Sequence, residues 1–193
     1  MRRSVRFGAV LLVLVLAACG GARTIPATNL DKLVLQQADV GPVFAAFNSG
    51  AQAQLDNQGT GRSDPSRYGR EGGWIARFHR PGSAATKGAL VVESRIDLFR
   101  SGDGAKKDLR AYRALFAAAP GSHLRPLQPS GLGDEATGVT FVQVGGATIR
   151  FFRIAWRYRN ATASVTVEGF DQKISVNDAT ALARKQQARL THA

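Results

Sequence analysis

The segment 161–168 constrains the fold of this chain most strongly, because its residues alternate strictly between two types. Small or branched apolar residues occupy the odd positions and polar residues the even ones, which is typical of a β-strand with side chains on alternate faces. A turn at Arg159-Asn160 would place the bulky residues of the preceding segment opposite the small ones, and such pairs pack well across two strands. The predicted pairs are Trp156–Ala163, Ile154–Val165 and Phe152–Val167.

A second hairpin is predicted upstream, because Gly145-Gly146 is a dipeptide that favours a two-residue turn. The apolar residues then change from odd to even positions at Phe151-Phe152, which a regular strand does not permit. We therefore expect a β-bulge or a sharp twist at that point. The alternative is that helices cover both faces of the first half of the strand. The predicted pairs of this hairpin are Val144–Ala147, Val142–Ile149 and Thr140–Phe151.

The rest of the chain adds strands and helices on both sides of these hairpins. Strands are predicted over 74–80 and 90–99, and a helix with Asp103 as its N-cap follows them and ends at Pro120-Gly121. Ser175-x-x-Asp178 has the spacing of a capping box before a last helix. Asp39 is predicted to cap a short helix that carries Val43, Phe44 and Phe47.

The segments 48–73 and 120–135 are rich in Gly, Pro and polar residues, which is typical of loops. The order of elements predicts a single α+β domain with a mainly antiparallel sheet of about five strands and two main helices packed on it.

The N-terminus has the organisation of a secretory signal peptide. Residues 1–7 carry three Arg and no acid, and the apolar or small residues 8–18 form a run too short to span a membrane. Cys19, the only cysteine, comes directly after this run, so an internal disulfide is excluded.

Leu16-Ala17-Ala18-Cys19 resembles the lipobox of bacterial lipoproteins. The resemblance implies that the chain is cut before Cys19 and that a diacylglycerol, with fatty acids such as palmitate, is attached to the Cys19 sulfur. The alternative is a plain cleaved signal with an incidental cysteine. We expect residues 1–18 to be the signal peptide, 19–30 the lipidated Cys and a tether, and 31–193 the domain. The domain would lie on the extracytoplasmic side of the cell membrane.

The charge of the chain is strongly positive, at +12 from 26 basic and 14 acidic residues. Without residues 1–18, 23 basic and 14 acidic residues remain, which is +9. An exported lipoprotein rarely meets nucleic acid, so we expect none as a partner and consider anionic lipids, acidic envelope polymers or a membrane protein. The alternative is a solvated basic surface, since 20 of the basic residues are Arg and only 6 are Lys.

No segment carries a recognisable catalytic or metal-binding pattern. The three histidines lie far apart without the spacing of metal ligands, and no G-x-S-x-G pentad is present. The sequence GLGDEA at 131–136 follows a Pro-rich loop rather than a strand, which argues against a dinucleotide site. We expect no cofactor, no metal and no catalytic residue.

GLGDEA at 131–136, RYRN at 157–160 and Val165-x-Val167 together resemble a pattern in small actinobacterial envelope lipoproteins and kinase-linked extracytoplasmic sensor domains. That pattern reads L-G-D-E-A, R-x-G-N and V, and Arg159 stands here where Gly is usual. The resemblance implies an extracytoplasmic binding or accessory domain and no catalytic residue. The order of strands and helices also resembles the α/β/α sandwich of PsbP-like proteins.

The expected function is therefore that of a lipid-anchored, non-catalytic binding, accessory or sensor module of the cell envelope. The alternative is a hydrolase of envelope lipid or glycan, with a Ser, a His and an acid brought together by the fold. Arg153, Arg157 and Arg159 would lie on one face of their strand and are candidate contacts to an anionic surface. An ordinary solvated sheet face, partly covered by helix and neutralised by Glu168, is the competing interpretation.

Overall fold

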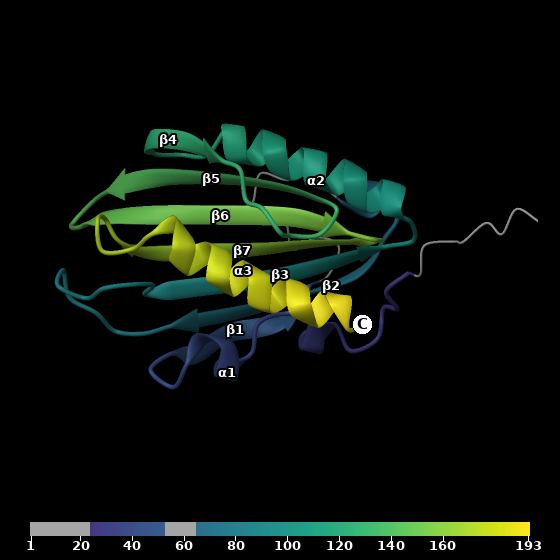
Figure 1. The fold of residues 1–193 in the computed structure, drawn as a ribbon, viewed down its shortest axis with the longest axis horizontal. Coiled ribbons are helices and arrows are strands. Elements are labelled where there is room, and N and C mark those ends of the chain that lie inside the picture. Colours follow the sequence, from purple (N-terminus) through teal and green to yellow (C-terminus); the bar gives the residue numbers. More distant parts are fainter. Residues whose placement is uncertain (1–23, 53–64) are drawn as a thin grey trace, which may run out of the picture.

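The computed structural model describes residues 24–52 and 65–193, so the predicted signal peptide and Cys19 lie outside the described residues. Seven strands form one sheet, and helices lie on both of its sides (Figure 1). In chain order the elements are η1 (Leu30–Leu33), α1 (Gln37–Val40), β1 (Ala45–Ala51), η2 (Pro65–Tyr68), β2 (Arg70–His79), β3 (Val91–Phe99), α2 (Gly102–Ala117), β4 (Ser122–Leu127), β5 (Glu135–Val144), β6 (Thr148–Tyr158), β7 (Ala161–Phe170) and α3 (Val176–Thr191).

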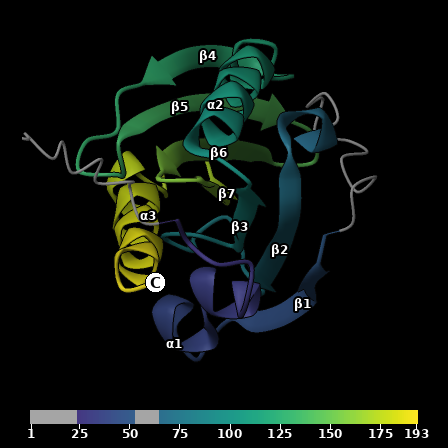
Figure 2. The same cartoon turned by 90° about the vertical axis from the view of Figure 1, so that its right-hand side faces the viewer.

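The sheet is antiparallel throughout, with the strand order β1-β2-β3-β7-β6-β5-β4. The expectation of about five strands is wrong, because β1 and β4 were assigned to a helix and to loops. These two are the edge strands (Figure 2), and nearly all of their residues are exposed. A strand with neither face buried has no need of alternating apolar residues, so its sequence resembles that of a loop.

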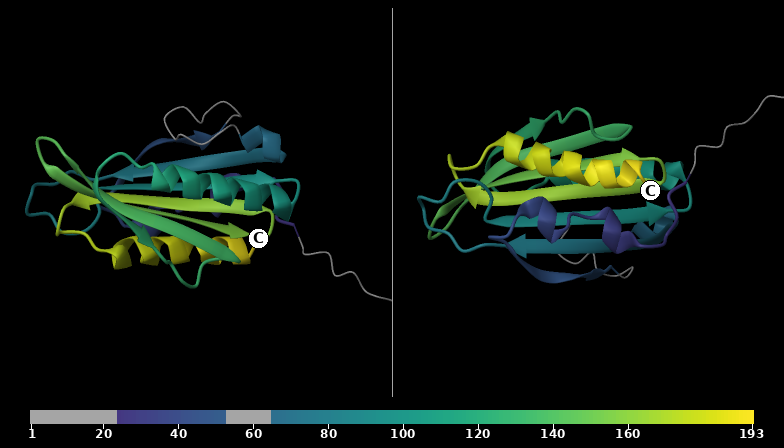
Figure 3. Two further views of the ribbon diagram at one scale, coloured as in Figure 1. Left: turned by 90° about the horizontal axis from the view of Figure 1, so that it is seen from above. Right: turned by 60° about the horizontal axis from the view of Figure 1, so that its bottom comes forward.

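The two long helices lie on opposite faces of the sheet, which gives three layers (Figure 3, left). Helix α2 packs on one face through Leu109, Tyr112 and Phe116. Helix α3 packs on the other face, together with the N-terminal segment that contains η1 and α1 (Figure 3, right). This arrangement agrees with the α/β/α layering that the sandwich analogy implied.

Strand β6 explains why the apolar residues change sides at Phe151-Phe152. Phe151 belongs to the cluster under α2, whereas Phe152, Ile154 and Trp156 belong to the cluster under α3. The pairing of β6 with both neighbours is continuous, so the predicted bulge is wrong. The alternative is correct, because a strand covered on both faces keeps apolar residues on both.

The predicted pairing of β6 with β7 is confirmed residue by residue, including Trp156 with Ala163. The pairing of β5 with β6 differs from the prediction by one residue, because Val144 pairs with Thr148 rather than with Ala147. The connection therefore contains Gly145, Gly146 and Ala147. One added turn residue moves every partner along the second strand by one position.

The helix boundaries differ from the prediction in two places. Ser101, not Asp103, is the N-cap of α2, and its hydroxyl accepts a hydrogen bond from Gly104 N (3.3 Å). Asp39 lies inside the four-residue α1, where its carboxylate accepts from Gln36 N (2.7 Å). The capping box of α3 is confirmed, since the Asp178 carboxylate accepts from Ser175 N (2.8 Å).

Candidate functional site

The three arginines proposed as surface contacts do not form one exposed stripe. Arg153 is half-buried on the α2 face, with its guanidinium carbon 5.0 Å from the ring centre of Phe141 and 6.0 Å from that of Phe151. Arg157 lies further along β6, where its Nη1 is 2.8 Å from the Asp134 carboxylate. Arg159 lies in the β6–β7 turn and stacks on Tyr158 at 4.8 Å. The structure thus gives each arginine a different environment.

Arg153 belongs to a set of four charged side chains, Arg77, Glu93, Arg153 and Glu168, which we call the charged row. Strand pairing places Arg77 opposite Glu93, Glu93 opposite Thr166, and Thr166 opposite Arg153, so these side chains share the α2 face of the sheet. Glu168 follows two residues after Thr166 on the same face. The row therefore crosses β2, β3, β7 and β6 beside the area that α2 covers.

The members of the charged row are only partly exposed to solvent. The side chains of Arg77 and Glu93 are 32% and 30% exposed, and Arg77 Nε lies 2.7 Å from the Glu93 carboxylate. Burial raises the pKa of Glu168 above its usual value, while the positive charge of Arg153 acts in the opposite direction. Burial likewise lowers the pKa of Arg153, against the effects of Glu168 and Glu93. Both shifts have the direction expected when burial outweighs the nearby opposite charges.

The chemistry of the charged row suits binding rather than support of the fold. Apolar side chains at these strand positions would avoid the desolvation cost, and perturbed pKa values of partly buried charges occur at functional sites as well as in structural ion-pair networks. Two carboxylates and two guanidinium groups offer acceptors and donors to a polar ligand. Phe47 and His79, in edge-to-face contact at 5.2 Å, lie at the β1 side of the same face.

The residues of the GLGDEA and RYRN motifs bond to one another at the C-terminal end of β6. Asp134 accepts a hydrogen bond from Arg159 N (3.1 Å) and pairs with Arg157, while its own N donates to Arg157 O (2.7 Å). Arg159 has a φ of 55°, in the left-handed region that glycine adopts most readily. This conformation explains why the resembling pattern has Gly at that position.

Asn160, the last residue of the RYRN motif, binds the N-terminal segment. Its side chain accepts from Ile25 N (2.7 Å) and donates to Ile25 O (3.1 Å) and to Phe99 O (2.9 Å). Ile25 itself is only 2% exposed, so the chain is packed into the fold well before residue 31, where the domain was expected to begin. GLGDEA and RYRN therefore connect β5, β6, β7, β3 and the N-terminal segment.

A second polar cluster lies buried between α2 and the sheet. Asp97 pairs with Arg70 (2.6 Å) and Arg95 (2.8 Å), and all three side chains are at most 4% exposed. Asp108 accepts from Thr162 Oγ1, and the Tyr112 hydroxyl lies 3.1 Å from Ser164 Oγ. These contacts join β2, β3, β7 and α2, so they help to fix how α2 sits on the sheet, although Arg70 Nη2 is buried without a hydrogen-bond partner among the described residues.

The structure offers no metal centre within residues 24–52 and 65–193, since no three His, Cys, Asp or Glu side chains gather there in a suitable arrangement. The adjacent Asp134 and Glu135 serve separate partners, because Glu135 bonds to Arg113 Nη2 (2.6 Å). That hydrogen bond lowers the pKa of Glu135, whose side chain is 34% exposed. No helix of the described part is both long and apolar enough to cross a bilayer.

Sequence analysis missed the charged row, although part of its pattern was visible. Glu93, Arg95 and Asp97 alternate with apolar residues along one strand, which indicated a polar face. Only the position of α2 separates Glu93, beside the helix, from Arg95 and Asp97, buried with the network beneath it. Glu168 was recognised only as a neutralising neighbour of the arginines.

Comparison with known proteins identifies the fold and no family. No protein-family model matches the chain, and the comparison with curated proteins finds no match in sequence. The crystal structure of the extracellular domain of PknH from Mycobacterium tuberculosis is similar, with a TM-score of 0.63 over 90% of this chain and 100% of that one. The sequences are 14% identical, so this likeness establishes a shared fold alone.

Proposed function

We propose that this chain is an extracytoplasmic binding module of the cell envelope, held at the membrane by a lipid on Cys19 and acting without catalysis. The Leu-Ala-Ala-Cys sequence supports the anchor. The fold shared with an extracellular domain supports the location. The observation that carries the binding role is the charged row, in which the partly buried guanidinium of Arg153 is held over two aromatic rings and burial disfavours the charged forms of Arg153 and Glu168.

The ligand expected at the charged row is polar and charged, because it has to replace water around two carboxylates and two guanidinium groups. Arg153 is held over two aromatic rings, so its guanidinium is already oriented before a ligand arrives. Such preorganisation reduces the entropy that binding costs. Components of the envelope, such as charged glycans or peptides, have the required chemistry.

The binding role is tested by gentle extraction of the protein from its own membrane, followed by native mass spectrometry for a retained ligand. Arg153→Gln should release that ligand, because it removes the oriented guanidinium. Arg150→Gln is the matched control, since Arg150 lies on the same strand and pairs with Asp171 (2.6 Å) on the opposite face. Equal retention of the ligand by both variants would exclude the charged row as the site.

The anchor is tested separately by Cys19→Ser. The expected result is loss of N-terminal processing or release of the protein from membranes, read by fractionation and by the mass of the N-terminal peptide. A variant that is processed and membrane-bound like the original protein would show that Cys19 is not the anchor.

A hydrolase of envelope lipid or glycan is the competing hypothesis. The described histidines lie on separate elements, with His79 on β2, His123 on β4 and His192 after α3. Turnover of envelope lipid or glycan that disappears in any single His→Ala variant would replace the binding role by this hypothesis.

A further inference from the structure

A pocket of about 460 Å³ lies between the N-terminal segment and the end of α3, away from the charged row. Its volume falls within the range of sites for small ligands. It is formed by the loop before η1, by η1 itself and by the last residues of the chain. The lining residues are Ile25, Pro26, Thr28, Asn29, Lys32, Leu33, Arg189, His192 and Ala193.

The pocket has an apolar floor and a basic rim. Ile25 and Leu33 are 2% and 7% exposed and contribute apolar surface from the core. Lys32 and Arg189 bring positive charge, His192 brings an imidazole, and no Asp or Glu is among the lining residues. Asp39 binds one side of Arg189 at 2.7 Å, whereas Lys32 forms no ion pair with any residue of the described ranges. This combination suits an anion attached to an apolar group.

The floor of the pocket is held rigidly in place. Asn160 binds both backbone groups of Ile25, and Leu35 N donates to Ser94 Oγ (2.9 Å) on β3. Ser94 in turn bonds to Gln186 on α3. The two walls of the pocket, the N-terminal segment and α3, are therefore tied to the same central strand, and a ligand would enter a preformed site.

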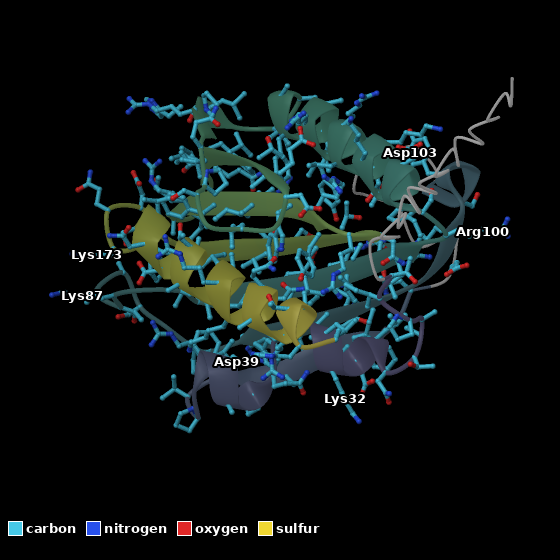
Figure 4. All side chains as sticks on the ribbon, turned by 45° about the vertical axis from the view of Figure 1, so that its right-hand side comes forward. Lys32, Asp39, Lys87, Arg100, Asp103 and Lys173 are labelled. Carbon is cyan, nitrogen blue, oxygen red and sulfur yellow. The ribbon has the colours of Figure 1, made fainter. Side chains whose placement is uncertain are left out.

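The position of the pocket in the chain brings it close to the expected anchor. Cys19 is only six positions before Ile25, which lines the pocket, so the two are at most about 20 Å apart. Lys32 lies near this end of the domain, and Lys87 and Lys173 lie at the opposite end (Figure 4). Arg159, one of the three proposed contacts, donates to Ala193 O (3.3 Å) at the edge of the pocket.

We propose that this pocket binds the head group of an anionic phospholipid in the membrane that carries the Cys19 anchor. The phosphate would lie near Lys32, Arg189 and His192, and the glycerol and first methylene groups would contact Ile25 and Leu33. This inference rests on the anchor in the proposed function and adds an orientation, because a bound head group would hold this end of the domain against the bilayer.

The test uses the full chain, purified from its own membrane in a neutral detergent, and a short-chain phosphatidylglycerol that carries a photoactivatable diazirine. After irradiation, mass spectrometry of the digest locates the labelled peptides. Labelling should concentrate in 24–33 and 189–193 and should be much weaker with the matching phosphatidylcholine probe. Lys32→Glu should reduce it about thirtyfold, which corresponds to about 2 kcal/mol, because the variant both removes a positive charge near the anionic lipid and adds a negative one.

Lys87→Glu is the matched control, because it makes the same change of charge at an exposed lysine of the opposite end. Labelling that is spread over the surface, equal for both probes, or equally reduced in both variants would overturn the proposal. The same digest contains the Cys19 peptide. An unmodified Cys19 would reject the anchor, while the labelling pattern would still decide whether the pocket binds the lipid.

Discussion

Replacing Asn160 by Ala should destabilise the protein more than is usual for a substitution in a two-residue turn. The Asn160 side chain is 3% exposed and makes three hydrogen bonds of 2.7–3.1 Å to the backbone of Ile25 and Phe99. Each buried backbone group left without a partner costs about 1–3 kcal/mol. Because water can replace some of the lost hydrogen bonds, we expect the free energy of unfolding to fall by about 3–5 kcal/mol. That is a large part of the about 5–15 kcal/mol by which a typical domain is stable.

Asn160→Asp tests the contribution of the hydrogen bonds separately from that of the side-chain volume. The carboxylate keeps an acceptor for Ile25 N but has no N–H groups for the carbonyls of Ile25 and Phe99. It also brings negative charge towards two carbonyl oxygens. We therefore expect this nearly isosteric variant to be at least as unstable as Asn160→Ala.

The assay is urea unfolding followed by far-UV circular dichroism, together with hydrogen exchange at the Ile25 amide. That amide should exchange much faster in Asn160→Ala, which removes its acceptor. It should also exchange faster in Asn160→Asp, which keeps an acceptor but loosens the segment by repelling the carbonyls of Ile25 and Phe99. Asn177→Ala, at an exposed position of α3, is the control and should leave the midpoint nearly unchanged. A midpoint shift for Asn160→Ala no larger than that of the control would refute the role of Asn160 in holding the N-terminal segment.

Three further changes test other parts of the structure. Trp156→Ala should cost about 3–5 kcal/mol in urea unfolding, because the side chain is 0% exposed at the centre of the α3 face; a shift as small as that of Val144→Ala, at a 75% exposed position, would contradict this. The raised pKa of Glu168 means that its ionisation opposes folding. As pH rises from the ordinary pKa of Glu through the raised pKa of Glu168, the original protein should therefore lose stability, whereas Glu168→Gln should not lose it through this group. Urea midpoints of the two proteins that change with pH in parallel would exclude this. Asp134→Asn should cost about 1 kcal/mol through its weaker bonds to the β6–β7 turn. A smaller shift than for Arg113→Gln, which removes the exposed ion pair with Glu135, would disagree.

The part of the fold that could be predicted from sequence is the part determined by neighbouring residues. The β6–β7 pairing follows from strict alternation in one strand and from the match of large residues with small ones in the other. Both patterns are local, because a short turn leaves little freedom in the register. The β5–β6 register was less certain, since Gly145-Gly146 permits either a two-residue or a three-residue connection, and the structure has the longer one.

The edge strands could not be predicted, because exposed strands lack the apolar periodicity on which such predictions depend. Five of the six residues of β4 are exposed, and the strand contains a proline, which only an edge position tolerates readily. Strand β1 is exposed along six of its seven residues, and its pairing with β2 is interrupted between Phe47 and Gly50. Both irregularities protect an edge from pairing with another chain, and both make the sequence look like a loop.

The same limit explains why the candidate site had to come from the structure. Along β3 the residues Glu93, Arg95 and Asp97 form one polar face, and the sequence offers no reason to treat them differently. Helix α2 crosses this face, so Arg95 and Asp97 become part of a closed network while Glu93 stays beside the helix with a half-exposed partner. The position of α2 thus determines whether a charged residue of β3 supports the fold or remains available to a ligand. The position of α2 depends in turn on its contacts with β5 and β6, which lie far along the chain from β3.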